Sequence, residues 1–234
     1  MIKALKSYAV NIFFKYGYSL SKIGHNNLFS SMVYYHFRKN KDLFFLQIGA
    51  NDGKSFDPIF FLAKHLRLKG IALEPINEYF QELSKNYSGT KVLPVNYAIY
   101  YTNTELAMYK VKKTEFLPVW SKGIASINSE HHKKSGIDLS SMEAVKVKAI
   151  TFETLFEQYD VRNIDILQID TEGYDYELIK LFPFDKMKPK IINFEHGLKD
   201  EIMSKKQFIE IVELLVGYGY SISMDNYDCL AYLK

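Results

Sequence analysis

Residues 43–53, Leu-Phe-Phe-Leu-Gln-Ile-Gly-Ala-Asn-Asp-Gly, constrain the fold of this chain more than any other stretch. A run of large apolar residues that ends in glycine-spaced small and polar residues is typical of a buried parallel strand followed by a tight loop. Asp57 then caps a predicted helix that has Pro58 at its first position and ends at Gly70. A strand, a glycine loop and a helix N-terminus bring unpaired backbone N–H groups close to a ligand, so this stretch predicts a small-molecule site.

Composition narrows the class of protein. The chain has 234 residues, enough for one large domain with an extension, and its net charge of +3 gives no reason to expect a nucleic-acid partner. Its one cysteine, Cys229, excludes an internal disulfide and a cysteine-rich metal site, and it favours a reducing, cytoplasmic location. No stretch approaches the roughly 20 apolar residues that a transmembrane helix needs.

Residues 1–41 differ from the rest of the chain, because they are basic and rich in aromatic side chains, and the first acidic residue is Asp42. Their pattern predicts two short amphipathic helices that are broken near Gly24. We expect this helical extension to pack its aromatic face on the following domain, residues 42–234. A dimer contact, a cover over the active site and a peripheral contact with anionic lipid on the inner face of the membrane are the alternatives.

Strands and helices alternate after the glycine loop, which predicts an α/β sheet covered by helices on both faces. Further buried strands are predicted over residues 70–75, 91–100, 165–170 and 189–195. Ligands bind at the carboxyl ends of the strands in such a sheet. Glu74 ends the second strand, where a carboxylate can accept both ribose hydroxyls of a nucleoside. Asn96 and Ala98 fall where the third strand would approach a bound base.

Four acidic residues crowd the end of the strand at 165–170 and the turn after it, namely Asp170, Glu172, Asp175 and Glu177. This concentration of negative charge is unfavourable unless a cation, a donor-rich ligand or solvent relieves it. Glu195 and His196 close the next strand. We therefore expect carboxylates and an imidazole at neighbouring strand ends.

The middle of the chain is less regular. Residues 105–111 and 145–150 alternate like strands, and a helix is predicted from Thr151. Further on, Ser204 and Gln207 predict a capping box at the start of another helix. The loop at 112–143 contains Trp120, and a loop of this length inside a compact domain is typical of a functional element such as a lid over a substrate.

The end of the chain separates two classes of nucleotide-binding enzyme. A nicotinamide dehydrogenase uses the same kind of glycine loop and the same kind of acidic residue after the second strand. The loop from Gly49 to Gly53, however, has only two of the three glycines of the dinucleotide fingerprint. Residues 218–223 and 227–233 predict a terminal hairpin, which is foreign to that architecture. The predicted fold is a Rossmann-like class I methyltransferase sheet of seven strands, mostly parallel, with an antiparallel C-terminal hairpin and an N-terminal helical extension.

Three motifs resemble those of FkbM-type S-adenosylmethionine-dependent methyltransferases: residues 45–53, residues 73–75 and the Leu-Gln-Ile-Asp-Thr-Glu-Gly-Tyr stretch at 167–174. The resemblance runs from about residue 42 to 233 and implies O-methylation, often of a sugar hydroxyl in surface polysaccharides, nucleotide-linked sugars or glycosylated natural products. Many members have an acid where Gln47 stands and a lysine where Gln168 stands. Gln47 can still hydrogen-bond the amino-acid end of the donor, whereas the missing lysine puts any lysine-assisted mechanism in doubt.

The predicted donor site consists of Gln47, Gly49, Asn51, Asp52, Gly53, Glu74, Asn96, Ala98 and Asp170. The acceptor hydroxyl must lose its proton to a general base or through a divalent ion. Asp170, Glu195 and His196 are candidate ligands for Mg²⁺ or Mn²⁺. In the alternative, His196 is the base and Asp170 or Glu172 orients it. In a third interpretation Glu172 only caps a helix and His196 is a structural loop histidine.

The leading hypothesis is an S-adenosylmethionine-dependent O-methyltransferase that acts on a carbohydrate or nucleotide-sugar substrate in polysaccharide biosynthesis. A non-catalytic relative that binds donor or carbohydrate and serves assembly is one alternative. An RNA methyltransferase rests only on the basic N-terminus and is a weaker one. The sequence leaves a homo-oligomer open.

Overall fold

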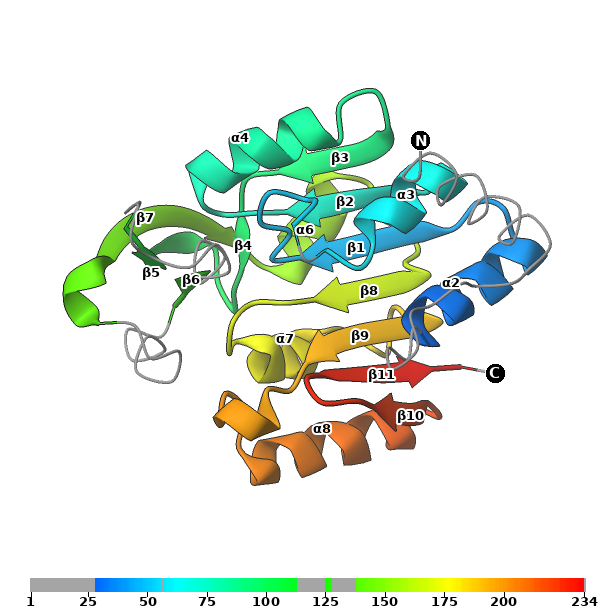
Figure 1. Ribbon diagram of the computed structural model, residues 1–234. Helices are drawn as coiled ribbons and strands as arrows, with labels where there is room; N and C mark the ends of the chain where they lie inside the picture. Colours follow the sequence, from blue (N-terminus) through cyan, green and yellow to red (C-terminus); the bar gives the residue numbers. More distant parts are fainter. Residues whose placement is uncertain (1–27, 56, 113–124, 128–137, 234) are drawn as a thin grey trace, which may run out of the picture.

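The computed structural model describes residues 28–55, 57–112, 125–127 and 138–233. Its main sheet has seven strands in the order β10-β11-β9-β8-β1-β2-β3 (Figure 1). The bounds are β1 Phe44–Ile48, β2 Lys69–Leu73, β3 Lys91–Val95, β8 Ile166–Ile169, β9 Ile191–Glu195, β10 Ser221–Met224 and β11 Asp228–Tyr232. Neighbouring strands from β9 to β3 are parallel, and the hairpin β10–β11 joins antiparallel to β9. The predicted class I methyltransferase sheet is confirmed.

Helices cover both faces of this sheet (Figure 1). They are α2 Leu28–Lys39, α3 Phe60–Leu66, α4 Asn77–Asn86, α6 Phe152–Gln158, α7 Asp175–Leu181 and α8 Lys205–Gly217, with short 3-10 helices at η2 Leu139–Ser141 and η3 Leu198–Asp200. Successive β1 residues point to opposite faces, so Phe45 packs with side chains of α2, α3 and α4, and Leu46 with those of α6, α7 and α8. Both faces of β1 are buried, which is why its sequence is continuously apolar around Gln47.

The helix after the glycine loop is shorter than predicted. Asp57 caps the turn that leads into it, because its Oδ1 accepts the backbone N–H groups of Ile59 at 2.8 Å and Phe60 at 3.2 Å. The predicted first position, Pro58, is wrong: α3 begins at Phe60, with Ile59 at its N-cap position. The predicted end at Gly70 is wrong: α3 ends at Leu66, and Arg67 takes a left-handed φ of 53°. Gly70 belongs to β2, where a Cβ would lie 2.4 Å from the Phe45 ring.

Part of the N-terminal extension is described. Helix α2 packs Phe29 and Val33 into the core beneath α3. The first of the two predicted helices falls in residues 1–27, outside the described residues. Among the helices that are described, none has the length and apolar character to cross a bilayer.

A second, four-stranded sheet packs beside the first, in the order β4-β7-β5-β6 (Figure 1). Its bounds are β4 Ala98–Ile99, β5 Thr104–Val111, β6 Ala125–Ser126 and β7 Met142–Ile150. The single strand predicted over residues 91–100 is wrong, because the chain leaves the main sheet after Val95 and β4 pairs with the end of β7. The Asn96 amide fixes this turn by donating to the carbonyl oxygens of Glu74 and Pro75, at 2.8 and 3.0 Å.

The loop predicted as a lid is described only in part. Trp120 and most of residues 112–143 lie outside the described residues. The described pieces are β6, which pairs with β5, and η2, which leads into β7.

One buried lysine links the second sheet to the first. Lys110 of β5 is 2% exposed, and its Nζ lies 3.1 Å from the Glu78 carboxylate on α4 and 3.0 Å from the Glu143 carboxylate on β7. Because α4 belongs to the main domain, this ion-pair triad holds the second sheet against it.

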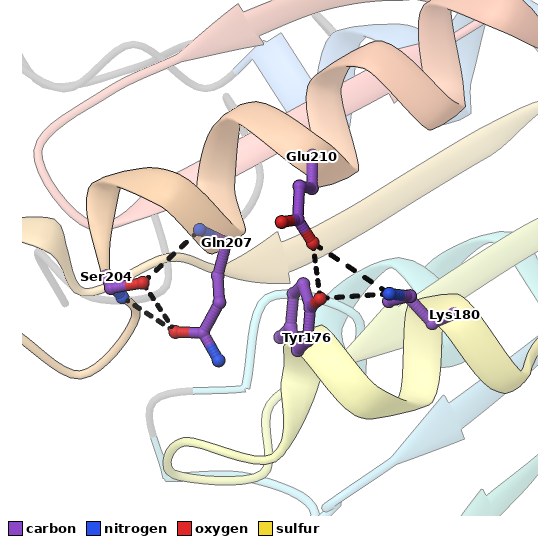
Figure 2. A network of polar contacts seen from close by, with 5 residues as sticks. All are labelled: Tyr176, Lys180, Ser204, Gln207 and Glu210. Carbon is purple, nitrogen blue, oxygen red and sulfur yellow. Dashed lines mark hydrogen bonds and ion pairs between the residues drawn. The ribbon is translucent and has the colours of Figure 1, made fainter.

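Helices α7 and α8 are joined by polar contacts (Figure 2). The Tyr176 hydroxyl donates to Glu210 at 2.5 Å and accepts from Lys180 at 3.0 Å. Ser204 and Gln207 form the predicted capping box at the start of α8. The contacts of Tyr176 and Lys180 with Glu210 tie α7 to α8.

Candidate active site

A cleft of about 680 Å³ opens at the carboxyl ends of β1, β2 and β8, next to the second sheet. Strand ends of the main sheet supply Gly49, Asn51, Glu74 and Asp170, while α4 and the second sheet supply Tyr79, Ala98, Met108, Ala125 and Ile127. The wall therefore has a polar half built from loops and an apolar half built from strands and α4. Such a division suits a polar donor molecule next to an acceptor.

Gly49 brings two strand ends together. Its φ is +81°, and a Cβ at this position would lie 1.8 Å from the backbone oxygen of Asp170. Its N–H and that of Ala50 donate to the Leu73 carbonyl, at 3.1 and 2.8 Å. The loop after β1 is thus held between the ends of β2 and β8, and only glycine permits this approach.

Glu74 lies at the end of β2 and is 5% exposed. Its Oε2 accepts the Asn51 N–H at 2.9 Å and its Oε1 accepts the Ile76 N–H at 2.8 Å. Burial raises the pKa of Glu74 to about 7, although both hydrogen bonds act to lower it. Each carboxylate oxygen keeps a lone pair that a ribose hydroxyl can use.

Three predicted donor residues support the loops instead of lining the cleft. The Asn96 amide contacts backbone carbonyls, as described above. Asp52 accepts the N–H groups of Lys54 and Ser55 within its own turn. Gly53 has a φ of +68°, and a Cβ there would lie 2.3 Å from Leu83 of α4. Asn96, Asp52 and Gly53 therefore shape the loops around the cleft. Their direct contact with the methyl donor stays a prediction.

Gln47 lies below the loop, side by side with Gln168 in the register of β1 and β8. Both side chains are 2% exposed, and among the described residues neither Oε1 accepts a hydrogen bond. Gln47 hydrogen-bonds Asp57, the residue that caps α3. Gln47 therefore contacts the helix cap, and its predicted contact with the donor stays a prediction.

Asp170 projects into the cleft from the end of β8, and its N–H donates to the Ile48 carbonyl at 3.0 Å. Its side chain keeps solvent-accessible surface inside the cleft. The pKa of Asp170 is raised well above the usual value, chiefly because the surrounding protein removes water from its carboxyl group. The negative charges of Glu172 and Glu195 add to this shift. A carboxylate with a raised pKa is a stronger proton acceptor once it is ionised.

Asp175, to which the sequence assigned no individual role, organises this edge of the sheet. It is 1% exposed and accepts the Thr171 N–H at 3.1 Å, the Thr171 hydroxyl at 2.7 Å and the Glu195 N–H at 3.2 Å. Burial raises its pKa to about 6. Asp175 thereby ties the turn after β8 to the end of β9. Helix α7 starts after Tyr174, whose side chain does not cap it, and a capping role for Glu172 stays a prediction.

His196 faces away from the cleft lining. Its Nδ1 accepts the Leu198 N–H at 3.1 Å, and its Nε2 lies 3.3 Å from the Asp225 carbonyl oxygen. The ring is 2% exposed, packs against Phe208, and its burial lowers its pKa. Both nitrogens are therefore engaged by backbone groups, as in a structural loop histidine.

The predicted metal ligands are not gathered into a ligand set. Within residues 28–55, 57–112, 125–127 and 138–233, no three His, Cys, Asp or Glu side chains are arranged to hold a metal ion. Glu195 lies near Asp170, and burial together with Glu172 and Asp175 raises its pKa to about 8. The nitrogens of His196 point elsewhere, so these residues do not fit a Mg²⁺ or Mn²⁺ centre.

Apart from Ala98, the residues of the apolar half of the cleft were not predicted. Tyr79, Tyr97 and Met108 line it, and Tyr174 closes it beside Asp170. Tyr97 and Tyr174 occur within motifs that the sequence singled out, which is the one signal that pointed to them. Tyr79 and Met108 reach the cleft only because the second sheet packs there.

Comparison with known proteins adds a family to this geometry. The model of the methyltransferase FkbM domain matches residues 47–222. None of the curated proteins matches the chain.

Several solved structures have a similar fold at low sequence identity, and three of them follow. An FkbM methyltransferase from Methylobacillus flagellatus KT is 12% identical over 86% of this chain and 50% of its own, with a TM-score of 0.49. Precorrin-6y C5,15-methyltransferase from Geobacter metallireducens GS-15 is 14% identical over 90% of both chains, with a TM-score of 0.43. A fibrillarin pre-rRNA processing protein from Methanococcus jannaschii is 12% identical over 82% of this chain and 66% of its own, with a TM-score of 0.41.

Proposed function

The chain belongs to the FkbM family of S-adenosylmethionine-dependent methyltransferases, and from that premise we propose that it methylates a hydroxyl group of a sugar. One observation supports the proposal: the cleft is lined by the accessible carboxylate of Asp170, by a polar half with Glu74 that we assign to the donor, and by a tyrosine-rich half that we assign to the acceptor. Tyrosine faces pack against the apolar faces of sugar rings, and carboxylates accept sugar hydroxyls, so this combination favours a carbohydrate acceptor.

The donor half fits S-adenosylmethionine. Only glycine lets the loop after β1 pack this closely on the Asp170 backbone, and both Gly49 and the Glu74 carboxylate line the cleft, where we assign Glu74 to the ribose of the donor. When bound, S-adenosylmethionine supplies a methyl group on a positively charged sulfur. The surrounding carboxylates favour a cation at this edge of the sheet.

Asp170 is the proposed general base, and Glu172 assists it. Asp170 accepts the proton of the acceptor hydroxyl as the oxygen attacks, and the like charge of Glu172 keeps its pKa raised. His196 has no place in this mechanism, because backbone groups engage both of its nitrogens. No step is assigned to a metal, since the candidate ligands do not fit one.

The buried thiol of Cys229 supports a cytoplasmic setting.

The test has two stages, both on the full chain. We expect isothermal titration to show S-adenosylmethionine binding in the micromolar range, and transfer of a radiolabelled methyl group to members of a carbohydrate panel. Asp170→Asn should lower kcat by about 100-fold, since a positioned base contributes about 10²–10⁴-fold. Asp185→Asn, on an exposed turn residue, is the matched control.

The outcomes separate the alternatives. Donor binding without transfer to any carbohydrate would contradict the proposal and favour a non-catalytic relative. Transfer to RNA alone, with tight binding that weakens steeply as salt is added, would replace it by an RNA methyltransferase.

A further inference from the structure

A groove of about 1040 Å³ lies between α6, the end of α7 and the residues that follow β4. Its walls carry Tyr100, Tyr101, Phe156, Leu181 and Met187. Tyr101 is 65% exposed and Leu181 is 37% exposed. Large side chains gathered in an exposed groove mark a binding surface more often than scattered ones do.

The groove continues from the cleft. Tyr174 lines the cleft and stacks on Tyr100 of the groove, with ring centroids 5.8 Å apart and planes 27° apart. Tyr100 in turn contacts Tyr101, and the centroids of these two rings are 4.3 Å apart. Three tyrosine rings therefore form a track that leads from the proposed methylation site into the groove.

Helix α7 joins the same two spaces. Tyr174, Leu178 and Leu181 follow one another at helical spacing, so they share a face of α7. The first two border the cleft and the third borders the groove. Helix α7 therefore contributes side chains to both the cleft and the groove.

The groove also has polar groups at its rim. Thr151, Glu153, Glu157 and Lys186 contribute to its wall, and Lys186 lies 3.5 Å from Glu153 with both side chains largely exposed. Exposed ion pairs of this kind contribute little to the stability of the fold, so the two charged groups can bind a ligand instead of each other. Aromatic faces with carboxylate, ammonium and hydroxyl groups around them match the apolar faces and peripheral hydroxyls of sugar rings.

We propose that this groove binds the sugars next to the methylated one, so that the acceptor is an oligosaccharide or polysaccharide chain instead of a single sugar. The inference rests on the proposed function. The cleft must hold the donor as well as the reacting sugar, and the groove offers further space on the acceptor side. Sugars bound there hold the reacting hydroxyl in place at Asp170, which is how remote binding increases the rate of transfer.

The experiment compares acceptors of different length. Full-length protein, radiolabelled S-adenosylmethionine and matched mono-, di- and tetrasaccharides of rhamnose, mannose, galactose and glucose give kcat/KM for each acceptor. We expect kcat/KM to rise at least about tenfold from monosaccharide to tetrasaccharide, a gain within the range of a few good contacts. Tyr101→Ala should reduce that gain to less than about threefold by raising KM, since stacked rings are worth about a kcal/mol each.

Two further variants make the result specific. Tyr101→Phe keeps the ring face and should keep the gain with chain length. Tyr35→Ala removes a tyrosine of similar exposure on α2, which is not part of the groove, and should behave like the wild type.

The failures are distinguishable. Equal kcat/KM for monosaccharides and tetrasaccharides would contradict sugar binding in the groove but would not contradict the proposed function. An unchanged gain in Tyr101→Ala would also contradict sugar binding in the groove. The absence of methyl transfer to carbohydrates of every length would overturn the proposed function and the groove with it.

Discussion

Gly49 shows how one residue fixes the loop of the proposed donor site. It lies where the loop after β1 meets the backbone of Asp170, so any Cβ collides with a main-chain oxygen that has no freedom to move aside. We expect Gly49→Ala to separate the ends of β1 and β8 and to lower S-adenosylmethionine affinity by at least about 100-fold, or about 2.7 kcal/mol. Isothermal titration measures the affinity.

Gly217→Ala is the matched control. Gly217 ends α8, has no neighbouring atom within 4 Å of a Cβ and needs no left-handed backbone. We expect this variant to bind the donor normally and to be slightly more stable, by about 0.5–1 kcal/mol, because alanine favours a helix. Equal affinities for the two variants would show that the approach at Gly49 has no part in donor binding.

Glu74 is expected to act through its charge. Glu74→Gln keeps the size of the side chain but places an amide N–H group where two carboxylate oxygens now accept hydrogen bonds. We expect donor affinity to fall by about tenfold, the value of roughly one hydrogen bond to a charged group. Titration of adenosine alone should show the same loss, and an unchanged adenosine affinity would remove Glu74 from the ribose contact.

At the scale of elements, the attachment of the second sheet depends on Lys110. Removing it leaves Glu78 and Glu143 without their shared cation, but both carboxylates are half-exposed and can become hydrated. We therefore expect Lys110→Ala to destabilise the protein by about 1–2 kcal/mol and to lower Tm by about 2–4 °C per kcal/mol. KM for the acceptor should rise more than that for the donor.

Lys148→Ala tests whether the effect belongs to the triad. Lys148 lies on β7 of the same sheet and is exposed, so its removal should change Tm by less than about 1 °C, as is usual for surface substitutions. Similar losses in the two variants would contradict the role of Lys110.

The elements of the main sheet could be predicted because their signals are local. Buried parallel strands appear in a sequence as apolar runs, and parallel strands all present their carboxyl ends at one edge, so the sequence alone predicts that Glu74 and Asp170 share one site. The capping box at Ser204 and the helix start at Thr151 are equally local, and both are confirmed.

The second sheet depends on contacts that are distant in sequence. A two-residue strand such as β4 carries no periodic pattern, and its pairing with β7 joins residues about 50 positions apart. The tyrosine and methionine wall of the cleft follows from that packing, so no local pattern announced it. For His196, the two backbone partners come from the following turn and from the terminal hairpin, and neither contact is visible in a motif.

At the scale of the whole molecule, negative charge is concentrated at one edge of the main sheet. The chain has a net charge of +3, yet Asp170, Glu172, Asp175, Glu195 and Asp228 gather at one edge of the main sheet. Burial and mutual repulsion raise the pKa of Glu195 to about 8 and that of Asp228 to about 6. A bound cationic donor relieves this repulsion, so stability and donor binding are linked at this edge.

The resulting pH dependence has a definite sign. A carboxyl group whose pKa is raised by folding binds its proton more tightly in the folded state, so the free energy of unfolding falls as pH rises through the raised value. The pKa of both groups rises from 4.5, to about 7 for Glu74 and about 8 for Glu195, so the loss begins above about pH 5 and is complete near pH 9. Its last part, most of it from Glu195, falls between about pH 7 and 9. His36 and His196, whose pKa values are lowered by burial, act in the opposite direction but only below about pH 7.

We therefore expect the ligand-free protein to lose about 3–5 °C in Tm between pH 7 and 9, measured by scanning calorimetry at constant ionic strength. Glu195→Gln removes the group with the most raised of these pKa values and should flatten the curve in this window. Glu213→Gln, on the exposed face of α8, should leave its slope unchanged. A Tm that rises from pH 7 to 9, or an equal slope in Glu195→Gln, would show that the acidic edge does not resist ionisation and that its repulsion is relieved without the donor.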